Sequence, residues 1–313
     1  VWCECCGFIL CFINRSACYD LCHLSLDEQK GVWIMMSIFR QINNWIHDFI
    51  FSKKMIVCIM TYIFMMEDVV VPMAKLANEA GVKYSIFEPF VLLLSHYDHF
   101  LIIPILFIVV MSDFPAKENG CIFAITRMGK TRYIISQIIY AFMIALIMIF
   151  LLGIMSILYS SGEKTTNWSE YMTSFHLSFP ELYQANNQLF VESSTVNQGT
   201  VCSVIFNSIL LLSAFLTLFA EILCYFKLKG HRFVGITVSL GILIIGTLLN
   251  GLHLKIKWLF PVSHVIYGEH FDVFLRKPIC ELWISYIYFI LLIVIMSVVN
   301  VVTIKKCQIG DER

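Results

Sequence analysis

Residues 133–160 read YIISQIIYAFMIALIMIFLLGIMSILYS, and this stretch decides the fold class because it contains no Asp, Glu, Lys or Arg. About 20 consecutive apolar residues in a helix cross the hydrocarbon core of a bilayer. The stretches 233–252 and 282–304 are equally free of charge, and 201–226 carries one acid, Glu221. Because a backbone inside a bilayer must satisfy its own hydrogen bonds, we predict four membrane-spanning helices here.

Two further spans are predicted from weaker signals, at 55–74 and 97–112. Glu67 and Asp68 interrupt the first stretch, and Pro104 interrupts the second. Their apolar runs are each 12 residues long, and 12 helical residues reach only about 18 Å. They are therefore either spans with polar outer halves or buried half-helices. We predict an all-α membrane protein with six transmembrane helices.

The composition excludes several other classes of protein. Charged residues are 14% of the 313 residues and hydrophobic residues are 59%, with a mean hydropathy of +0.79. Soluble domains carry about 25% charged residues, so a disordered chain and an ordinary soluble enzyme are excluded. The 22 bases balance 22 acids. No basic footprint for nucleic acid is present, and we predict the lipid bilayer, not nucleic acid, as a partner.

Lysine and arginine are distributed unequally between the two sides of the predicted topology. With the N-terminus inside, 13 of them lie in inner segments and seven in outer segments. By the positive-inside rule we expect a multi-pass protein of the cell membrane with cytoplasmic N- and C-termini. The inner set is Arg40, Lys53, Lys54, Lys117, Arg127, Lys130, Arg132, Lys227, Lys229, Arg232, Lys305, Lys306 and Arg313.

Two outer segments are distinctive. Residues 161–199 carry aromatic side chains at spacings of three and four, which predicts an amphipathic surface helix or a packed cap, interrupted at Pro180. Residues 255–281 alternate between aromatic and polar character. We expect this last outer segment to lie at the membrane interface or to re-enter part of the bilayer.

The first 34 residues differ from the rest and hold six of the 12 cysteines. Lys30-Gly31-Val32 can be encoded by AAA-GGA-GTN, which contains a bacterial ribosome-binding sequence, and Met35 follows at a suitable distance. We therefore expect 1–34 to be an atypical head made of translated upstream sequence, with the functional protein starting at Met35 or Met36.

Residues 35–54 have the pattern of an amphipathic helix. Apolar residues such as Ile42, Trp45 and Phe49 recur at helical spacing, while Arg40 and Asp48 occupy other faces. We predict an N-terminal amphipathic interfacial helix on the inner side of the membrane. The transmembrane domain then follows over 55–313.

The sequence AITRMGKT at 124–131 resembles a loosened phosphate-binding P-loop in which Ala replaces the first Gly. A functional P-loop lies between a buried strand and a helix and needs a downstream acid for magnesium. Here a predicted span follows, and no α/β domain surrounds the motif. We therefore predict no ATPase site, no enzyme activity and no cofactor in this chain.

The same inner loop, 113–132, carries a second pattern. Asp113-Phe114-Pro115 precedes Arg127-Met128-Gly129-Lys130, and Tyr133 opens the next span. This arrangement resembles the permease subunit of a bacterial type-2 ATP-binding-cassette (ABC) exporter. The resemblance covers about 36–310 and includes the interfacial helix, six spans, a long second outer loop and a partly re-entrant last outer segment. Lys130 stands where many relatives have Arg.

The resemblance implies that this loop forms a coupling helix against a separate ABC ATPase subunit, which would bind ATP and magnesium. It also implies a homodimer or a heterodimer with another permease. A membrane protein driven by a soluble motor needs a rigid inner protrusion whose charges fix the register. The alternative is that the same residues hold the loop at the lipid headgroups. The candidate coupling residues are Glu118, Arg127, Gly129, Lys130 and Arg132.

Acids inside the membrane are costly and often functional. Glu67, Asp68 and Glu221 are therefore candidates for a translocation path, although the first two could also simply end the first span early. The histidine clusters at 96–99 and 264–270 match neither H-E-x-x-H nor H-x-x-E-H, so we predict no metal site.

The sequence therefore predicts the membrane subunit of an ABC transporter, with export as the expected direction. The alternative is a stand-alone secondary transporter or membrane sensor without an ATPase partner. Inverted repeats would favour that alternative, and no repeat relates the first three spans to the last three.

Overall fold

The computed structural model describes residues 39–306 except 116–124, 127, 253 and 273–276. The chain divides into two units, 1–47 and 48–313. In the first unit, the described residues 39–47 are helical. Among the described residues of the second unit, helices and turns account for the regular structure, and extended pairing is limited to two isolated bridges. The predicted all-α class is confirmed.

Five helical stretches of the second unit are long and apolar enough to cross a bilayer, which indicates a membrane-embedded protein. Four of them correspond to the four clearest apolar runs of the sequence. Their bounds are α8 (Lys130–Tyr159), α13 (Val201–Leu228), α14 (Arg232–Gly251) and α16 (Leu282–Lys306), and the fifth runs over Lys53–Ala80.

The fifth stretch is continuous through its two acids. It consists of α3 (Lys53–Met65), the π-helical turn η1 (Met66–Val70) and α4 (Val71–Ala80). Glu67 and Asp68 therefore do not end this helix early, because it continues for more than two turns beyond them. A π-helical turn widens the helix locally, and such turns are frequent at functional sites.

The stretch predicted as a second span, 97–112, is not a straight helix of its own. A short helix α5 (Glu88–Ser95) precedes α6 (Tyr97–Val110), and the two are bent by 73°. The extended backbone of His96 makes the break. Pro104 lies inside α6 without ending it. A final turn, η2 (Met111–Asp113), leads into the inner loop.

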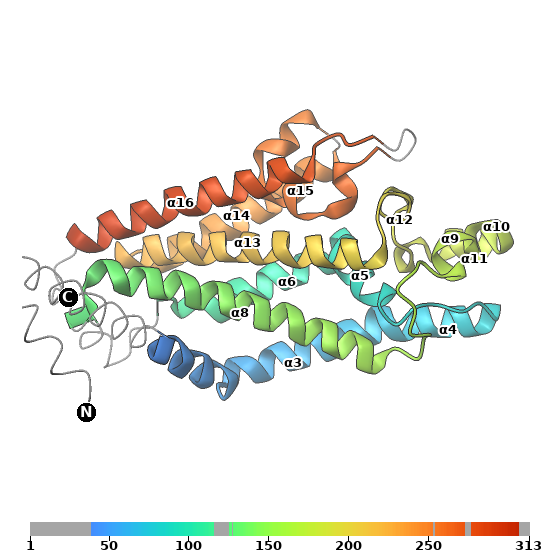
Figure 1. Cartoon of the computed structure of the whole chain (residues 1–313), viewed down its shortest axis with the longest axis horizontal. Coiled ribbons are helices and arrows are strands. Elements are labelled where there is room, and N and C mark those ends of the chain that lie inside the picture. The colour runs from blue at the N-terminus through green and yellow to red at the C-terminus, as the bar shows by residue number, and fades with distance from the viewer. Residues whose placement is uncertain (1–38, 116–124, 127, 253, 273–276, 307–313) are drawn as a thin grey trace, which may run out of the picture. The chain divides into compact units, whose positions relative to one another are not determined.

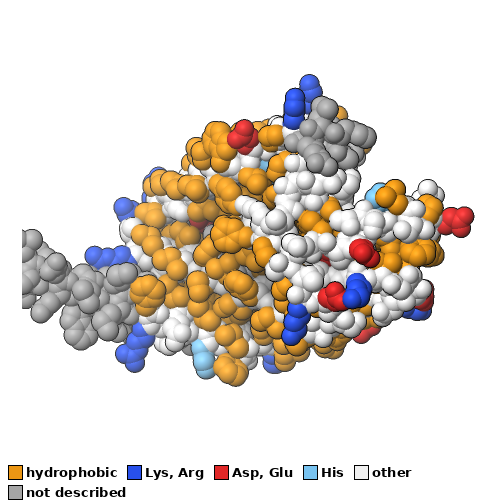
Figure 2. Space-filling model, turned by 45° about the vertical axis from the view of Figure 1, so that its right-hand side comes forward, with side chains coloured by type: hydrophobic (Ala, Val, Ile, Leu, Met, Phe, Trp, Pro, Cys, Tyr) orange, Lys and Arg blue, Asp and Glu red, His pale blue; other side chains and the backbone are white. Residues whose placement is uncertain are grey.

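Helix α13 is the centre of the bundle. It packs against α8, α14 and α16, and also against α5 and α6 (Figure 1). In its most apolar part, 72% of the residues are buried, compared with 17–33% in the other four long helices. Figure 2 shows apolar side chains covering the middle of one face, with most charged side chains toward the ends. Such an apolar belt is what a lipid-facing surface requires.

Residues 161–199 form a packed cap, so the second of the two predicted forms is the one observed. The cap contains α9 (Glu170–Thr173), α10 (Phe175–Ser178), α11 (Pro180–Ala185), η3 (Asn187–Leu189) and α12 (Ser193–Gln198). Its core is an aromatic cluster in which Phe190 stacks on Tyr171 and contacts Phe175 and Tyr183. Pro180 starts α11 and so separates it from α10, as predicted.

The segment between α14 and α16 folds into three short helical turns. These are η4 (Lys255–Leu259), α15 (Pro261–Val265) and η5 (Tyr267–His270). Every residue of α15 is buried, and this helix packs against α13, α14 and α16. The predicted re-entry into the bilayer stays a prediction, whereas the close packing on the helix ends is observed.

A buried carboxylate joins the cap to the bundle. Glu88 of α5 accepts hydrogen bonds from the backbone N–H groups of Ser85 and Ser169, at 3.0 and 2.6 Å, and from the Ser169 hydroxyl at 2.7 Å. The Glu88 side chain has no solvent exposure. The cap is thus held at its start by a fully satisfied acid, which an exposed loop would not need.

We predict that Glu88→Ala releases the cap. The change leaves two buried N–H groups without an acceptor, and we expect the unfolding free energy to fall by about 3 kcal/mol. Limited proteolysis in detergent should then cut within 161–199. Glu181→Ala, which removes an exposed acid of α11, is the control and should leave the cleavage pattern unchanged. Equal resistance of the two variants would contradict the anchoring role.

Candidate functional site

The root of the inner loop is an ion cluster centred on Asp113. The two carboxylate oxygens of Asp113 bind Lys54 Nζ at 3.3 Å and an Arg232 guanidinium nitrogen at 2.7 Å. Arg232 also lies 3.3 Å from the Ser112 hydroxyl, and Lys54 donates to the Val110 carbonyl at 2.8 Å. The end of α6 is therefore tied to the starts of α3 and α14.

A third base completes this cluster, which we call the Asp113 clamp. Lys227, near the end of α13, donates to the backbone carbonyls of Asp113 and, at 2.7 Å, of Pro115. Partial burial alone would raise the pKa of the Asp113 carboxyl, but the charges of Lys54, Arg232 and Lys227 outweigh burial and lower it. The carboxylate is thus ionised, and four helices meet at one residue.

All of the basic partners in the clamp belong to the set predicted on the inner side of the membrane. In the sequence, these bases indicate only the orientation, and nothing there marks Asp113 as their common partner. The sequence carries only a weak signal for this cluster. Asp113 directly follows the predicted span 97–112, and Lys54, Lys227 and Arg232 directly adjoin three other predicted spans. Which of these charges meet is decided by helix packing.

The predicted coupling residues follow Asp113 in the sequence. Glu118 and Arg127 fall outside the described residues. Lys130 opens α8 and donates to the Lys305 carbonyl of α16 at 3.4 Å, whereas the Arg132 side chain is exposed. Helix α8 and the end of α16 are thus in contact at the same end of the bundle as the clamp. We call this the basic end, comprising the clamp with Lys130, Lys229, Lys305 and Lys306.

Gly129 has a backbone conformation that explains its place in the motif. Its φ and ψ are 83° and 154°, a region that is essentially restricted to glycine. Its N–H donates to the Ile125 carbonyl at 2.8 Å, and its carbonyl accepts from Tyr133 N–H at 3.1 Å. Gly129 therefore links a short turn of the loop to the first turn of α8 at a sharp corner.

The candidate path acids are not grouped together. Glu67 and Asp68 are exposed on η1, and Asp68 lies 3.9 Å from His99 of α6. Glu221 is buried seven residues before the end of α13. That distance corresponds to about 10 Å along the helix, whereas Asp68 lies about 20 Å from Lys54. Glu67 and Asp68 are neighbours on η1, whereas Glu221 lies on α13 at a different depth, and a path that includes all three acids stays a prediction.

Glu221 joins the two most closely packed helices. The Ser297 hydroxyl of α16 donates to Glu221 Oε1 at 2.9 Å, and the Asn300 amide donates to the Glu221 carbonyl at 3.1 Å. Oε2 of Glu221 has no hydrogen-bond partner among the described residues. Hydrogen bonds between helices in a bilayer hold them together. The contacts of Glu221 thus indicate a structural role at the α13–α16 contact.

A second buried polar cluster lies under the last outer segment. Ser285 Oγ of α16 is 2.8 Å from His264 Nδ1 and 2.7 Å from His270 Nε2. The other nitrogen of each ring faces a backbone carbonyl. His264 Nε2 lies 2.8 Å from the Trp258 carbonyl oxygen, and His270 Nδ1 lies 3.1 Å from the Ile266 carbonyl oxygen. Carbonyl oxygens only accept hydrogen bonds, so His264 Nε2 and His270 Nδ1 carry the protons. In neutral rings, the nitrogens that face Ser285, His264 Nδ1 and His270 Nε2, are therefore acceptors.

Burial keeps both histidines neutral near pH 7. It lowers the pKa of His264, and it lowers the pKa of His270 to about 4 against the opposing effect of the hydrogen bond to Ile266. The Ser285 hydroxyl then has one hydrogen for two ring acceptors and donates to one at a time. Beside this cluster, the buried ammonium of Lys257 pairs with the Glu269 carboxylate.

Within the described parts of the chain, no group of three or more His, Cys, Asp or Glu side chains is arranged to hold a metal ion. Comparison of the chain with protein families, with curated proteins and with solved structures finds no match.

We predict that Asp113→Ala loosens the basic end. It removes two ion pairs, each worth up to about 1 kcal/mol at partial exposure, and leaves three bases facing one another. Hydrogen exchange should accelerate at the starts of α3 and α14 and little in the cap. Glu79→Ala, which removes an exposed pair with Lys75, is the control. Slow exchange at both helix starts in Asp113→Ala would show that the clamp does not hold them.

We predict that the stability of the protein falls on acidification from pH 6.5 to about 4. In this window the unfolded chain binds a proton at His270 that the folded chain excludes, which costs about 3 kcal/mol of stability over the full range. Thermal unfolding in detergent measures the effect. His270→Asn should flatten the pH dependence, whereas His176→Asn, at an exposed histidine of the cap, should not. Identical slopes for His270→Asn and the unaltered protein would contradict this assignment.

Proposed function

We propose that this protein is the permease subunit of an ABC transporter, with export as the direction of transport. The observation that carries the proposal is the attachment of the inner loop. At its start, Asp113 binds bases from α3 and α14 while Lys227 of α13 holds the backbone. At its end, Gly129 turns directly into α8. A force on this loop would reach five helices at once.

This arrangement suits a membrane protein driven by a separate motor. Closure of two ATPase subunits would push the loops of two permeases and rock their helices between inward- and outward-facing packings. Lys130 and Arg132, with Glu118 and Arg127 by sequence, would fix the register against the ATPase through complementary charge. The ATPase subunit would bind ATP and magnesium and perform all of the hydrolysis.

The distribution of charge supports the proposed topology. Bases from four segments predicted to be cytoplasmic, represented by Lys54, Lys130, Arg232 and Lys305, lie at one end of the bundle. The positive-inside rule would place this end, and both termini, in the cytoplasm. The bent pair α5–α6 would serve as the sixth span, and the segment 255–270 as the partly re-entrant one.

The decisive experiment is purification of the tagged protein from its own membranes in a mild detergent after cross-linking. We expect an ABC ATPase to co-purify and to hydrolyse ATP. Gly129→Ala should lose most of this ATPase while the membrane protein remains at its normal level, because a Cβ is strained at this backbone conformation by about 1–3 kcal/mol.

Gly241→Ala is the matched control, because neither glycine has an atom near the added Cβ and only Gly129 has a positive φ. Equal co-purification with both variants would contradict the coupling role of the motif. Absence of any ATPase from the cross-linked unaltered protein would overturn the proposal and leave a stand-alone secondary transporter or sensor.

A further inference from the structure

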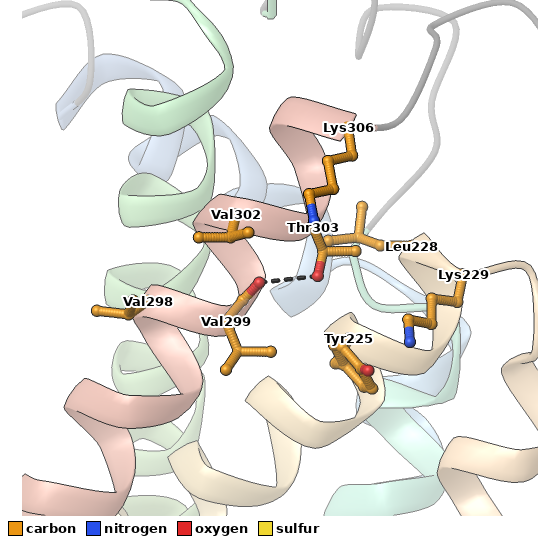
Figure 3. Close-up of a pocket in the computed structure, with 8 residues that line it drawn as sticks. All are labelled: Tyr225, Leu228, Lys229, Val298, Val299, Val302, Thr303 and Lys306. Atoms are coloured by element: carbon orange, nitrogen blue, oxygen red, sulfur yellow. Dashed lines mark hydrogen bonds between the residues drawn. The ribbon is translucent and has the colours of Figure 1, made fainter.

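A groove lies at the basic end between the last turns of α13 and α16. Its volume is about 560 Å³. Tyr225 and Lys229 line it from α13, and Val298, Val302, Thr303 and Lys306 line it from α16 (Figure 3). The hydrogen bonds of Glu221 to Ser297 and Asn300 join the two helices close to the groove. The groove therefore belongs to the best-fixed helix pair of the bundle.

The groove has two chemical parts. Its floor is apolar, and Val298 and Val302 keep 57% and 45% of their surface exposed. Its other part carries two ammonium groups, with Lys229 Nζ placed 4.6 Å above the ring of Tyr225. Among the described residues, no carboxylate lines the groove and no ion pair is formed by Lys229 or Lys306.

The polar groups of the groove favour a ligand that accepts hydrogen bonds. The Thr303 hydroxyl already donates to the Val299 carbonyl at 2.8 Å, shown dashed in Figure 3. The remaining strong donors are the two ammonium groups. Each helix C-terminus adds about half a negative charge, but two lysines outweigh the two termini and leave the groove positive. An anion with an apolar extension matches both parts.

We propose that this groove binds an anionic phospholipid, with its phosphate at Lys229 and Lys306 and an acyl chain along Val298 and Val302. The depth is right for such a ligand, because the lysines end two apolar helices where headgroups meet the hydrocarbon core. Basic residues next to a membrane surface attract anionic lipids. This inference is independent of the proposed transport function.

Native mass spectrometry of the full chain in detergent tests the proposal with added phosphatidylglycerol or phosphatidylcholine. We expect the unaltered protein to retain phosphatidylglycerol preferentially. The double variant Lys229→Gln/Lys306→Gln should lower its retention by about tenfold or more. The control Lys164→Gln/Lys277→Gln removes the same charge from exposed lysines outside the groove and should leave retention unchanged.

A second pair of variants tests the apolar floor without changing charge. Val302→Trp fills the groove and should weaken retention, whereas Val294→Trp lies at an exposed position of α16 outside it and should not. Retention of phosphatidylglycerol by Lys229→Gln/Lys306→Gln at the unaltered level would overturn the proposal. The proposal would also be overturned if inorganic phosphate displaced the lipid and both tryptophan variants retained it equally. That result would mark the groove as a site for small anions.

Discussion

The packing of α13 is the constraint on which the rest of the bundle depends. This helix contacts α5, α6, α8, α14 and α16 and is the only one of the five long helices with most of its apolar part buried. A central helix in a bilayer cannot be held by hydrophobicity alone, since lipid tails are as apolar as its neighbours. Close packing and polar contacts between helices have to fix it instead, and two of the polar contacts are those of Glu221 with α16 and of Lys227 with the segment that follows α6.

These two contacts connect the separate features of the basic end. Lys227 follows Glu221 by six residues on α13, and the groove begins on the same turns with Tyr225 and Lys229. The clamp uses one acid against three bases, so the basic end keeps an excess of positive charge. Asp113 pairs with the bases of the clamp, whereas Lys229 and Lys306 line the groove.

The sequence was informative where structure follows from local chemistry. A run without charge such as 133–160 must become a helix in lipid whatever surrounds it, and α8 covers it almost to the residue. The break at His96 and the π-helical turn at Glu67 could not be predicted in this way. The break at His96 has no proline or glycine beside it, so it depends on how the helices pack, which hydropathy does not record. Pro72 follows the π-helical turn and lacks the N–H that would bond to the Asp68 carbonyl, but hydropathy does not show that a π-helical turn results.

The same distinction separates the parts of the candidate site. The inner loop and its glycine were picked out in the sequence by the motif Arg127-Met128-Gly129-Lys130, and the structure adds that Gly129 has a backbone conformation that other residues avoid. The Asp113 clamp, the anchor at Glu88 and the contact of His270 with Ser285 join residues 15 to 119 positions apart in the sequence, and no spacing rule predicts such contacts.

The buried polar residues of this bundle also limit how the intramembrane acids can be interpreted. Glu88 and Glu221 are both acids at zero exposure, and each accepts hydrogen bonds that join two segments of the protein, Glu88 through both carboxylate oxygens and Glu221 through Oε1. A group that lines a route for substrate has to exchange those partners for the substrate or for water. Glu67 and Asp68 meet that requirement better, since they are exposed on a turn where the regular helical hydrogen bonding is already altered. The contacts of Glu221 therefore assign it to the α13–α16 contact, and a translocation path at Glu67 and Asp68 stays a prediction.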